Sequence, residues 1–116
     1  MAPGETRILC KLAAIPDGEG LGFTLGEGEA QRLIFVIRQG ERVYAYVNSC
    51  PHAGTPLDWT PNRFLTYDKR HILCATHGAR FRIYDGYCFA GPCQGDRLTA
   101  LPVAVVDGEV VLGAVA

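Results

Sequence analysis

Two short segments of the chain each place a cysteine close to a histidine, and this pattern limits the fold more than any other feature. Cys50 and His52 are separated by one residue, and Cys74 and His77 by two. Structural zinc modules usually group cysteines with cysteines and histidines with histidines. Here each segment offers one thiolate and one imidazole, a ligand mixture that can place two thiolates on one metal and two imidazoles on its neighbour. The alternative is that the cysteines are unrelated core residues and the histidines are ordinary polar residues.

A glycine accompanies each segment, Gly54 after the first and Gly78 after the second. The complete pattern resembles the signature of the Rieske ferredoxin family, whose [2Fe–2S] centre has two histidines in place of two cysteines on one iron. The resemblance implies Cys50 and Cys74 as ligands of the buried iron, and His52 and His77 as ligands of the outer iron. It also implies that the two glycines allow tight turns and direct amide groups toward the cluster sulfides.

The pattern of short apolar runs and turns independently predicts an all-β fold. Leu33–Arg38 is rich in β-branched and aromatic residues, and Gln39-Gly40 separates it from Arg42–Val47, which predicts a hairpin. Asp-Gly pairs at 85–86 and 107–108 predict two further hairpins with type I′ turns, in which both central residues have positive φ. The resemblance adds the architecture: a β-sandwich or barrel with a small cluster-binding subdomain inserted at about residues 49–94.

Two stretches have the composition of loops. Ile15–Gly22 holds a proline, an aspartate and several glycines, and Thr60–Arg70 is polar, with a proline and an asparagine near its start. We expect the first to be a loop before the main hairpin and the second to be an extended surface loop within the cluster-binding part.

Length and charge exclude several classes of protein. The 116 residues suit one domain, which we assign to residues 1–116, and 48% hydrophobic residues are enough for a core. Lys and Arg number 11 and Asp and Glu 12, so no basic excess favours nucleic acid or an anionic membrane surface. The first residues lack the pattern of a signal peptide, and no run of apolar residues is long enough to span a membrane. We expect a cytoplasmic protein.

Three cysteines remain after the ligands are assigned: Cys10, Cys88 and Cys93. An odd number in a chain without a secretion signal favours reduced thiols over a disulfide framework. Cys88 and Cys93 are close enough in sequence to pair across a turn, and this remains the alternative. The roles of all three are left open.

Four positions bear on the reduction potential. High-potential Rieske proteins have an extra cysteine in each ligand loop, and the two cysteines form a disulfide that braces the site. The matching positions here are Thr55 and Thr76, so this chain cannot form that disulfide. Those proteins also place a serine and a tyrosine hydroxyl near the cluster, where this chain has Ala79 and Phe81. Fewer hydrogen bonds to the cluster stabilise the reduced state less. We therefore expect a potential near the low end of the Rieske range, about −150 mV.

Further residues surround the two ligand segments. Gly91-Pro92-Cys93 resembles the proline-bearing loop that covers the cluster in this family, and Pro56 and Trp59 are expected to shield it. His71 precedes a short apolar run and is expected to be packed or solvated rather than a ligand. Five basic residues lie around the second segment and can steer an acidic partner: Arg63, Lys69, Arg70, Arg80 and Arg82.

The chain shows no nucleophile–base pair, no phosphate-binding loop and no mononuclear iron motif of two histidines and a carboxylate. The leading hypothesis is a one-electron carrier, not an enzyme, that takes electrons from a flavin-dependent reductase to a terminal oxygenase. One alternative is a small non-catalytic subunit of a larger oxidoreductase such as nitrite reductase. Another is a zinc-stabilised interaction module, which would be colourless where a Rieske protein is red-brown. The oligomeric state is not predicted.

Overall fold

The computed structural model describes residues 7–25, 32–49, 57, 63–66, 68–74 and 78–113. Nearly all regular structure in this part of the chain is β, with one short 3-10 turn, η1 (Leu12–Ala14). The strands are β1 (Arg7–Lys11), β2 (Gly20–Leu25), β3 (Arg32–Gln39), β4 (Arg42–Val47), β5 (His71–Leu73), β6 (Arg80–Arg82), β7 (Cys88–Ala90), β8 (Ala100–Leu101), β9 (Val103–Val106) and β10 (Glu109–Leu112). The all-β prediction is confirmed.

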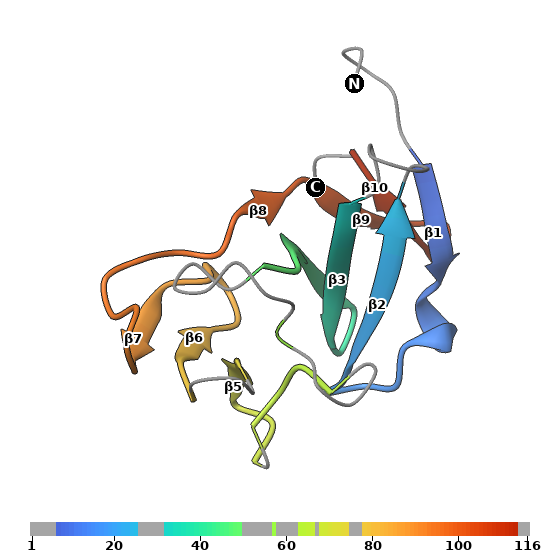
Figure 1. Cartoon of the computed structure of the whole chain (residues 1–116). Coiled ribbons are helices and arrows are strands. Elements are labelled where there is room, and N and C mark those ends of the chain that lie inside the picture. Colours follow the sequence, from blue (N-terminus) through green and yellow to red (C-terminus); the bar gives the residue numbers. More distant parts are fainter. Residues whose placement is uncertain are drawn as a thin grey trace.

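The strands form three antiparallel sheets, in the orders β1-β10-β9, β2-β3-β4-β8 and β5-β6-β7. The first two sheets form a β framework, and the third lies to one side of it (Figure 1). In the chain, the third sheet is inserted between β4 and β8. This is the inserted arrangement that the resemblance predicts.

Strand β3 separates two hydrophobic cores because its side chains alternate between the two faces of the sheet. Val36 packs with Ile15, Ala45 and Val110 inside the framework. Phe35 and Ile37 face the other way and join the core beneath the third sheet. Residues from Ile34 to Ile37 are fully buried, as expected for a strand with a core on both sides.

The Phe35 ring stacks on the Phe64 ring, with centroids 4.4 Å apart and planes 11° apart. Phe64 is 1% exposed, and its carbonyl accepts a hydrogen bond from the Leu73 amide at 2.8 Å. Leu65 forms an isolated antiparallel bridge with Ile72. The expectation that Thr60–Arg70 is wholly a surface loop is therefore wrong for residues 64–66, because the apolar pair Phe64-Leu65 packs on the core and is hydrogen-bonded alongside β5.

The predicted hairpins occur, with one difference in turn type. Strands β3 and β4 form the first predicted hairpin, with Gln39 opposite Arg42. At the β9–β10 turn, Asp107 and Gly108 have φ of 52° and 77°, which confirms the type I′ expectation.

For the Asp85-Gly86 pair, the prediction of a type I′ turn is wrong, because Gly86 has a positive φ of 72° and Asp85 does not have a positive φ. The Arg82 carbonyl accepts a hydrogen bond from the Gly86 amide, and the Arg82 amide donates to the Tyr87 carbonyl. These bonds close a four-residue loop in which the last residue alone is left-handed. The side chain of Asp85 caps this loop by accepting a hydrogen bond from the Tyr87 amide at 3.0 Å.

Two strand boundaries also differ from the sequence expectation. Strand β2 begins at Gly20, within the stretch expected to be loop, because a Cβ there would lie 2.6 Å from the Ile37 side chain and only glycine fits. Pro102, which has no amide hydrogen, divides the run 101–106 into β8 and β9. The chain passes there from the sheet that contains β4 to the sheet that contains β10.

Candidate metal centre

The second ligand segment starts where β5 ends and is held by backbone hydrogen bonds at both of its described ends. The Cys74 amide donates to the Ala79 carbonyl at 2.8 Å, and the Gly78 amide donates to the Cys74 carbonyl at 2.9 Å. Gly78 has a φ of 73°, the left-handed conformation that glycine adopts without steric cost. The expected tight turn is confirmed. The expected direction of the Gly78 amide is not, since this amide is committed to the Cys74 carbonyl.

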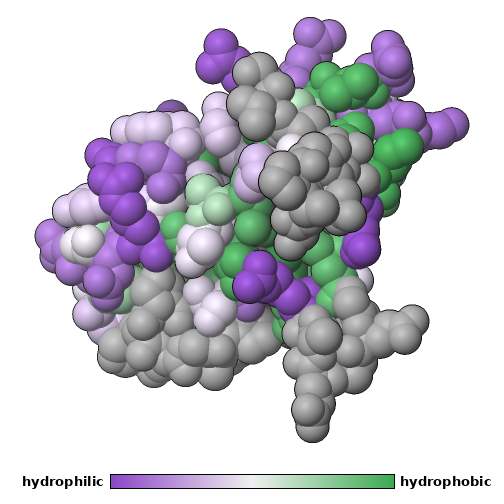
Figure 2. Space-filling view, turned by 90° about the horizontal axis from the view of Figure 1, so that it is seen from above, coloured by the Kyte–Doolittle hydropathy of each residue, from purple (hydrophilic) through white to green (hydrophobic). Residues whose placement is uncertain are grey.

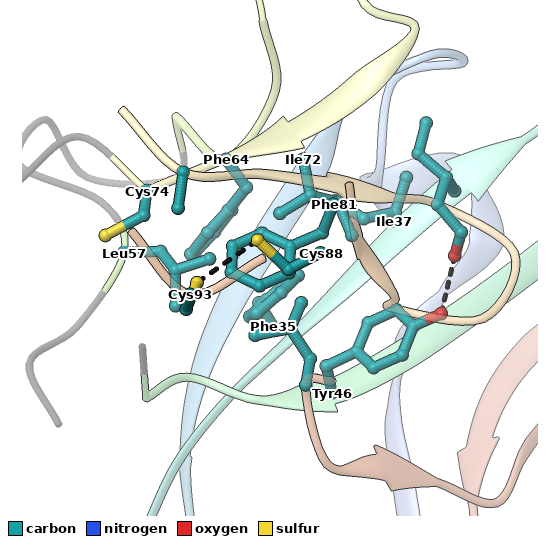
Figure 3. Packing of buried hydrophobic residues seen from close by; sticks show 13 residues of the cluster. Phe35, Ile37, Tyr46, Leu57, Phe64, Ile72, Cys74, Phe81, Cys88 and Cys93 are labelled. Atoms are coloured by element: carbon teal, nitrogen blue, oxygen red, sulfur yellow. Dashed lines mark hydrogen bonds between the residues drawn. The ribbon is translucent and has the colours of Figure 1, made fainter. Parts of the chain in front are cut away.

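Cys74 is fully buried and lies at the edge of the core beneath the third sheet. Figure 3 shows its sulfur directed outward from that core, whereas the Phe64, Ile72 and Phe81 side chains fill the interior. A thiolate at such a position suits a buried iron, because a charged sulfur needs a metal to offset the cost of leaving water.

Gly91 fits closely against the second segment. A Cβ at Gly91, whose φ is 97°, would lie 2.7 Å from the Ala79 Cα. Since Ala79 is hydrogen-bonded to Cys74, the turn that begins at Gly91 packs directly on the backbone that holds this cysteine. The predicted covering loop, 91–93, therefore begins beside the second ligand segment.

Ala79 and Phe81 are both fully buried in the same core as Cys74. Phe81 faces the interior of the β5-β6-β7 sheet, and neither side chain carries a hydroxyl group. No side-chain hydrogen bond from these two positions can stabilise a reduced cluster, and the low potential stays a prediction.

The outer face of the third sheet carries stacked arginine and aromatic side chains. Arg80 and Arg82 flank the buried Phe81 on β6, so both lie on the face opposite the core. The Arg82 guanidinium lies 5.1 Å from the Tyr84 ring centroid and 4.6 Å from that of Tyr87. Figure 2 shows hydrophilic side chains gathered on the side of the molecule that holds β6 and β7.

Asp85 fixes Arg82 in this arrangement. Its two carboxylate oxygens accept hydrogen bonds from Arg82 Nε at 3.0 Å and from Nη2. These bonds lower the pKa of Asp85, although partial desolvation acts in the opposite direction. The same pairing raises the pKa of Arg82.

The other basic residues named from the sequence are spread over the surface of this part of the molecule. Arg63, Arg70 and Arg80 are exposed, and Lys69 forms an exposed ion pair with Glu19 at 3.3 Å. Arg97, which the sequence reasoning missed, lies 5.5 Å from the Tyr87 ring centroid. The isolated bridge between Tyr87 and Arg97 places them together, a pairing that local sequence does not signal.

His71 is half-buried on β5 and packs against Phe89, with ring centroids 4.6 Å apart. This agrees with the expectation of a packed histidine. Cys10 lies on β1 of the framework, where burial raises the pKa of its thiol. Cys88 and Cys93 are in contact with one another within the core of the third sheet, with no disulfide between them.

Several predicted positions lie outside the described residues. They are the ligands Cys50, His52 and His77, together with Gly54, Thr55, Pro56, Trp59 and Thr76. Of the four predicted ligands, the structure therefore places Cys74 alone. Within the ranges that are described, no three His, Cys, Asp or Glu side chains gather into a metal-binding group, and no helix is long and apolar enough to cross a membrane.

An all-β framework with an inserted three-stranded sheet, and a buried cysteine at the end of β5 beside the turn at Gly91, is the arrangement that the resemblance to Rieske ferredoxins implies. The sequence model of the Rieske [2Fe-2S] domain matches residues 5–107. The chain belongs to the Rieske [2Fe-2S] domain family, and a Rieske-type [2Fe–2S] cluster is its cofactor.

Solved structures of ferredoxins are similar to the whole chain. The ferredoxin of carbazole 1,9a-dioxygenase from Nocardioides aromaticivorans IC177 is 26% identical, with a TM-score of 0.74 over 94% of this chain and 97% of that one. The ferredoxin of Sphingomonas yanoikuyae B1 is 28% identical, with a TM-score of 0.71 over 93% and 97%. A chain in a complex of reduced oxygenase and oxidised ferredoxin of carbazole 1,9a-dioxygenase is 25% identical, with a TM-score of 0.72 over 92% and 91%. Comparison with curated proteins gives no significant match.

Proposed function

We propose that this protein is a cytoplasmic one-electron carrier that takes electrons from a flavin-dependent reductase and delivers them to a terminal oxygenase. The observation that carries this proposal is the end-to-end similarity to the Nocardioides ferredoxin, whose chain is covered to 97%. A ferredoxin of a dioxygenase system transfers electrons, so we assign no catalysis to the chain itself.

We propose Cys50 and Cys74 as ligands of the inner iron and His52 and His77 as ligands of the outer iron, within a subdomain of about residues 49–94. The burial of Cys74 and the tight turn from Cys74 to Gly78 support the second half of this set. When bound, the cluster supplies one reversible electron. Neutral imidazole ligands make the centre less negative than an all-cysteine one, which raises its potential.

The chain's own residues shield the proposed metal centre from water and offer a surface to a partner. The side chains of Ile72, Phe81 and Leu57 exclude water from behind Cys74, and Gly91 packs on Ala79, whose carbonyl accepts the Cys74 amide hydrogen bond. The outer face of the third sheet is available for a partner, and its stacked arginines favour an acidic one. Residues 63–98 hold six of the chain's Lys and Arg residues and three of its Asp and Glu, whereas the remainder holds five and nine.

A coupled assay tests the carrier role. Substrate oxidation by a reductase and a terminal oxygenase encoded beside this gene is expected to require the cluster-loaded protein. Cys74→Ser, which removes the proposed ligand, is expected to abolish both the Rieske EPR signal and the coupled activity. A protein that accepts electrons but reduces no oxygenase, and copurifies with a larger oxidoreductase subunit, would favour the accessory-subunit alternative.

The ligand assignment has its own test. His52→Cys is expected to keep a cluster and lower its potential, because a thiolate adds negative charge to the site. An unchanged potential would show that His52 is not a ligand. His71→Cys is the matched control, since the structure packs His71 against Phe89, and its substitution is expected to leave the potential and the EPR signal unaltered.

A further inference from the structure

Cys88 and Cys93 form a buried pair of thiols in the core beneath the third sheet. The Cys93 Sγ donates a hydrogen bond to the Cys88 Sγ at 3.2 Å (Figure 3). The Cys88 thiol in turn donates to the Ala90 carbonyl at 3.2 Å. Cys88 is 0% and Cys93 3% exposed. The two sulfurs are in direct contact, with no side chain between them.

The backbone holds the two residues in this position. The Cys88 carbonyl accepts a hydrogen bond from the Gly95 amide at 2.9 Å, and the Cys88 amide donates to the Asp96 carbonyl at 2.8 Å. The Asp96 amide in turn donates to the Cys93 carbonyl at 2.9 Å. The segment after β7 is therefore folded back onto the start of β7, and the thiols meet because of main-chain bonds rather than a chance side-chain orientation.

A disulfide has an S–S bond of about 2.0 Å. The two sulfurs, 3.2 Å apart, therefore need to approach by only about 1 Å to reach bonding distance. The five-residue separation closes a small loop whose backbone is already ordered. The reduced pair thus needs little rearrangement to become a disulfide.

We propose that Cys88 and Cys93 are a redox-active pair that a low-molecular-weight disulfide, such as oxidised glutathione, converts to an intrachain disulfide. The Cys93 sulfur, as its thiolate, attacks the external disulfide, forms a mixed disulfide and releases one thiol. The Cys88 sulfur then attacks the Cys93 sulfur and displaces the second thiol. The protein loses two electrons and two protons, and the external disulfide is reduced to two thiols.

The position of the pair gives the disulfide an effect on the metal centre. Cys93 lies two residues after Gly91, which contacts Ala79, and Ala79 is hydrogen-bonded to Cys74. A bond from Cys93 to β7 ties down the turn that packs on the second ligand segment. We therefore expect the disulfide to restrict opening of this turn and to slow loss of the cluster.

Peptide mapping tests the pairing on the cluster-loaded protein. Trypsin cleaves after Arg82 and Arg97 and so places both cysteines in the single peptide 83–97, while Cys10 is in the separate peptide 8–11. After incubation with oxidised glutathione, alkylation and digestion, peptide 83–97 is expected to lack both alkyl groups and the mass of two hydrogen atoms. Because the thiols are buried, we expect conversion over minutes to hours.

Reduced glutathione in excess is expected to restore both alkylation sites. Full alkylation of 83–97 after prolonged oxidation would overturn the proposal. So would a cross-link from Cys88 or Cys93 to another cysteine. These readouts do not depend on electron transfer to any partner, so they can fail or succeed independently of the proposed function.

The effect on the cluster has a separate measurement. Decay of the visible absorption in a chelator is expected to be at least about threefold slower for the oxidised than for the reduced pair, because the cross-link restricts the turn. Cys88→Ser and Cys93→Ser each remove the pair, and their decay rates are expected not to respond to the glutathione ratio. Cys10→Ser is the control and is expected to respond like the unaltered protein. Equal decay for both states of the unaltered protein would overturn the bracing effect.

Discussion

The phenol of Tyr46 on β4 donates a hydrogen bond to the carbonyl of Ile83, just after β6, at 2.6 Å. This bond joins the framework to the inserted sheet, since β4 and β6 belong to different sheets. Tyr46 is 2% exposed. Burial, with a smaller contribution from the charge of Asp85, raises the pKa of Tyr46 well above its usual range. The phenol therefore remains a donor even in alkaline solution.

Tyr46→Phe removes this link and leaves the buried Ile83 carbonyl without its phenol partner. We expect a loss of about 1–2 kcal/mol in the free energy of unfolding, measured by denaturant titration. Tyr84→Phe is the control, because Tyr84 is 64% exposed and a phenylalanine ring keeps the cation–π contact with Arg82. Equal effects of the two substitutions would show that the Tyr46 hydrogen bond contributes nothing specific.

Gly91→Ala is expected to destabilise the covering turn, by more than about 1 kcal/mol. The new Cβ would meet the Ala79 Cα at 2.7 Å, and the φ of 97° disfavours any residue with a side chain. Gly95→Ala separates the two causes, because Gly95 has a nearly identical φ of 98° but nothing within 4 Å of its Cβ position. We expect Gly91→Ala to cost more stability and to release the cluster faster. Equal losses would mean that backbone strain alone matters.

Asp85→Asn is expected to lower stability at neutral pH and to have little effect in acid. The Asp85 pKa is lowered in the folded state, chiefly by its hydrogen bonds with Arg82. Its contribution is therefore fully present above the unfolded pKa of about 3.9 and is lost as the pH falls through the lower, folded value. Unfolding titrations of both proteins from neutral pH to below pH ~3 are expected to converge at the acid end. A constant difference at every pH would exclude ionisation of Asp85 as the cause.

Ala79→Ser is expected to raise the reduction potential. A hydroxyl at this buried position, which corresponds to the serine of high-potential Rieske proteins, can donate to the cluster. A hydrogen bond that favours the reduced state by about 1 kcal/mol raises a one-electron potential by about 40 mV. Ala45→Ser is the control, since Ala45 is 3% exposed but belongs to the framework core. An unaltered protein with a potential above about +100 mV would contradict the low-potential expectation.

Arg80→Glu is expected to slow association with an acidic redox partner, roughly threefold or more at low salt, with a smaller effect at high salt. Arg80 is exposed on the outer face of the third sheet. Arg42→Glu makes the same charge reversal at an exposed site on the framework strand β4 and is expected to have less effect. Stopped-flow oxidation of the reduced protein by its oxygenase measures both. Equal slowing by the two variants would indicate a response to net charge rather than to this face.

The sequence by itself determined the family, the cofactor class and most of the strand-forming segments along the chain. Ligand identity and spacing are local properties, and alternating apolar residues around Gln39-Gly40 and Asp107-Gly108 predict hairpins from short-range turn geometry. Only the tertiary structure decided how Gly91 meets Ala79, how Tyr46 reaches Ile83, and that Cys88 and Cys93 share one buried contact. These relations join separate strands and turns, and they depend on backbone packing that the local composition of the chain does not encode.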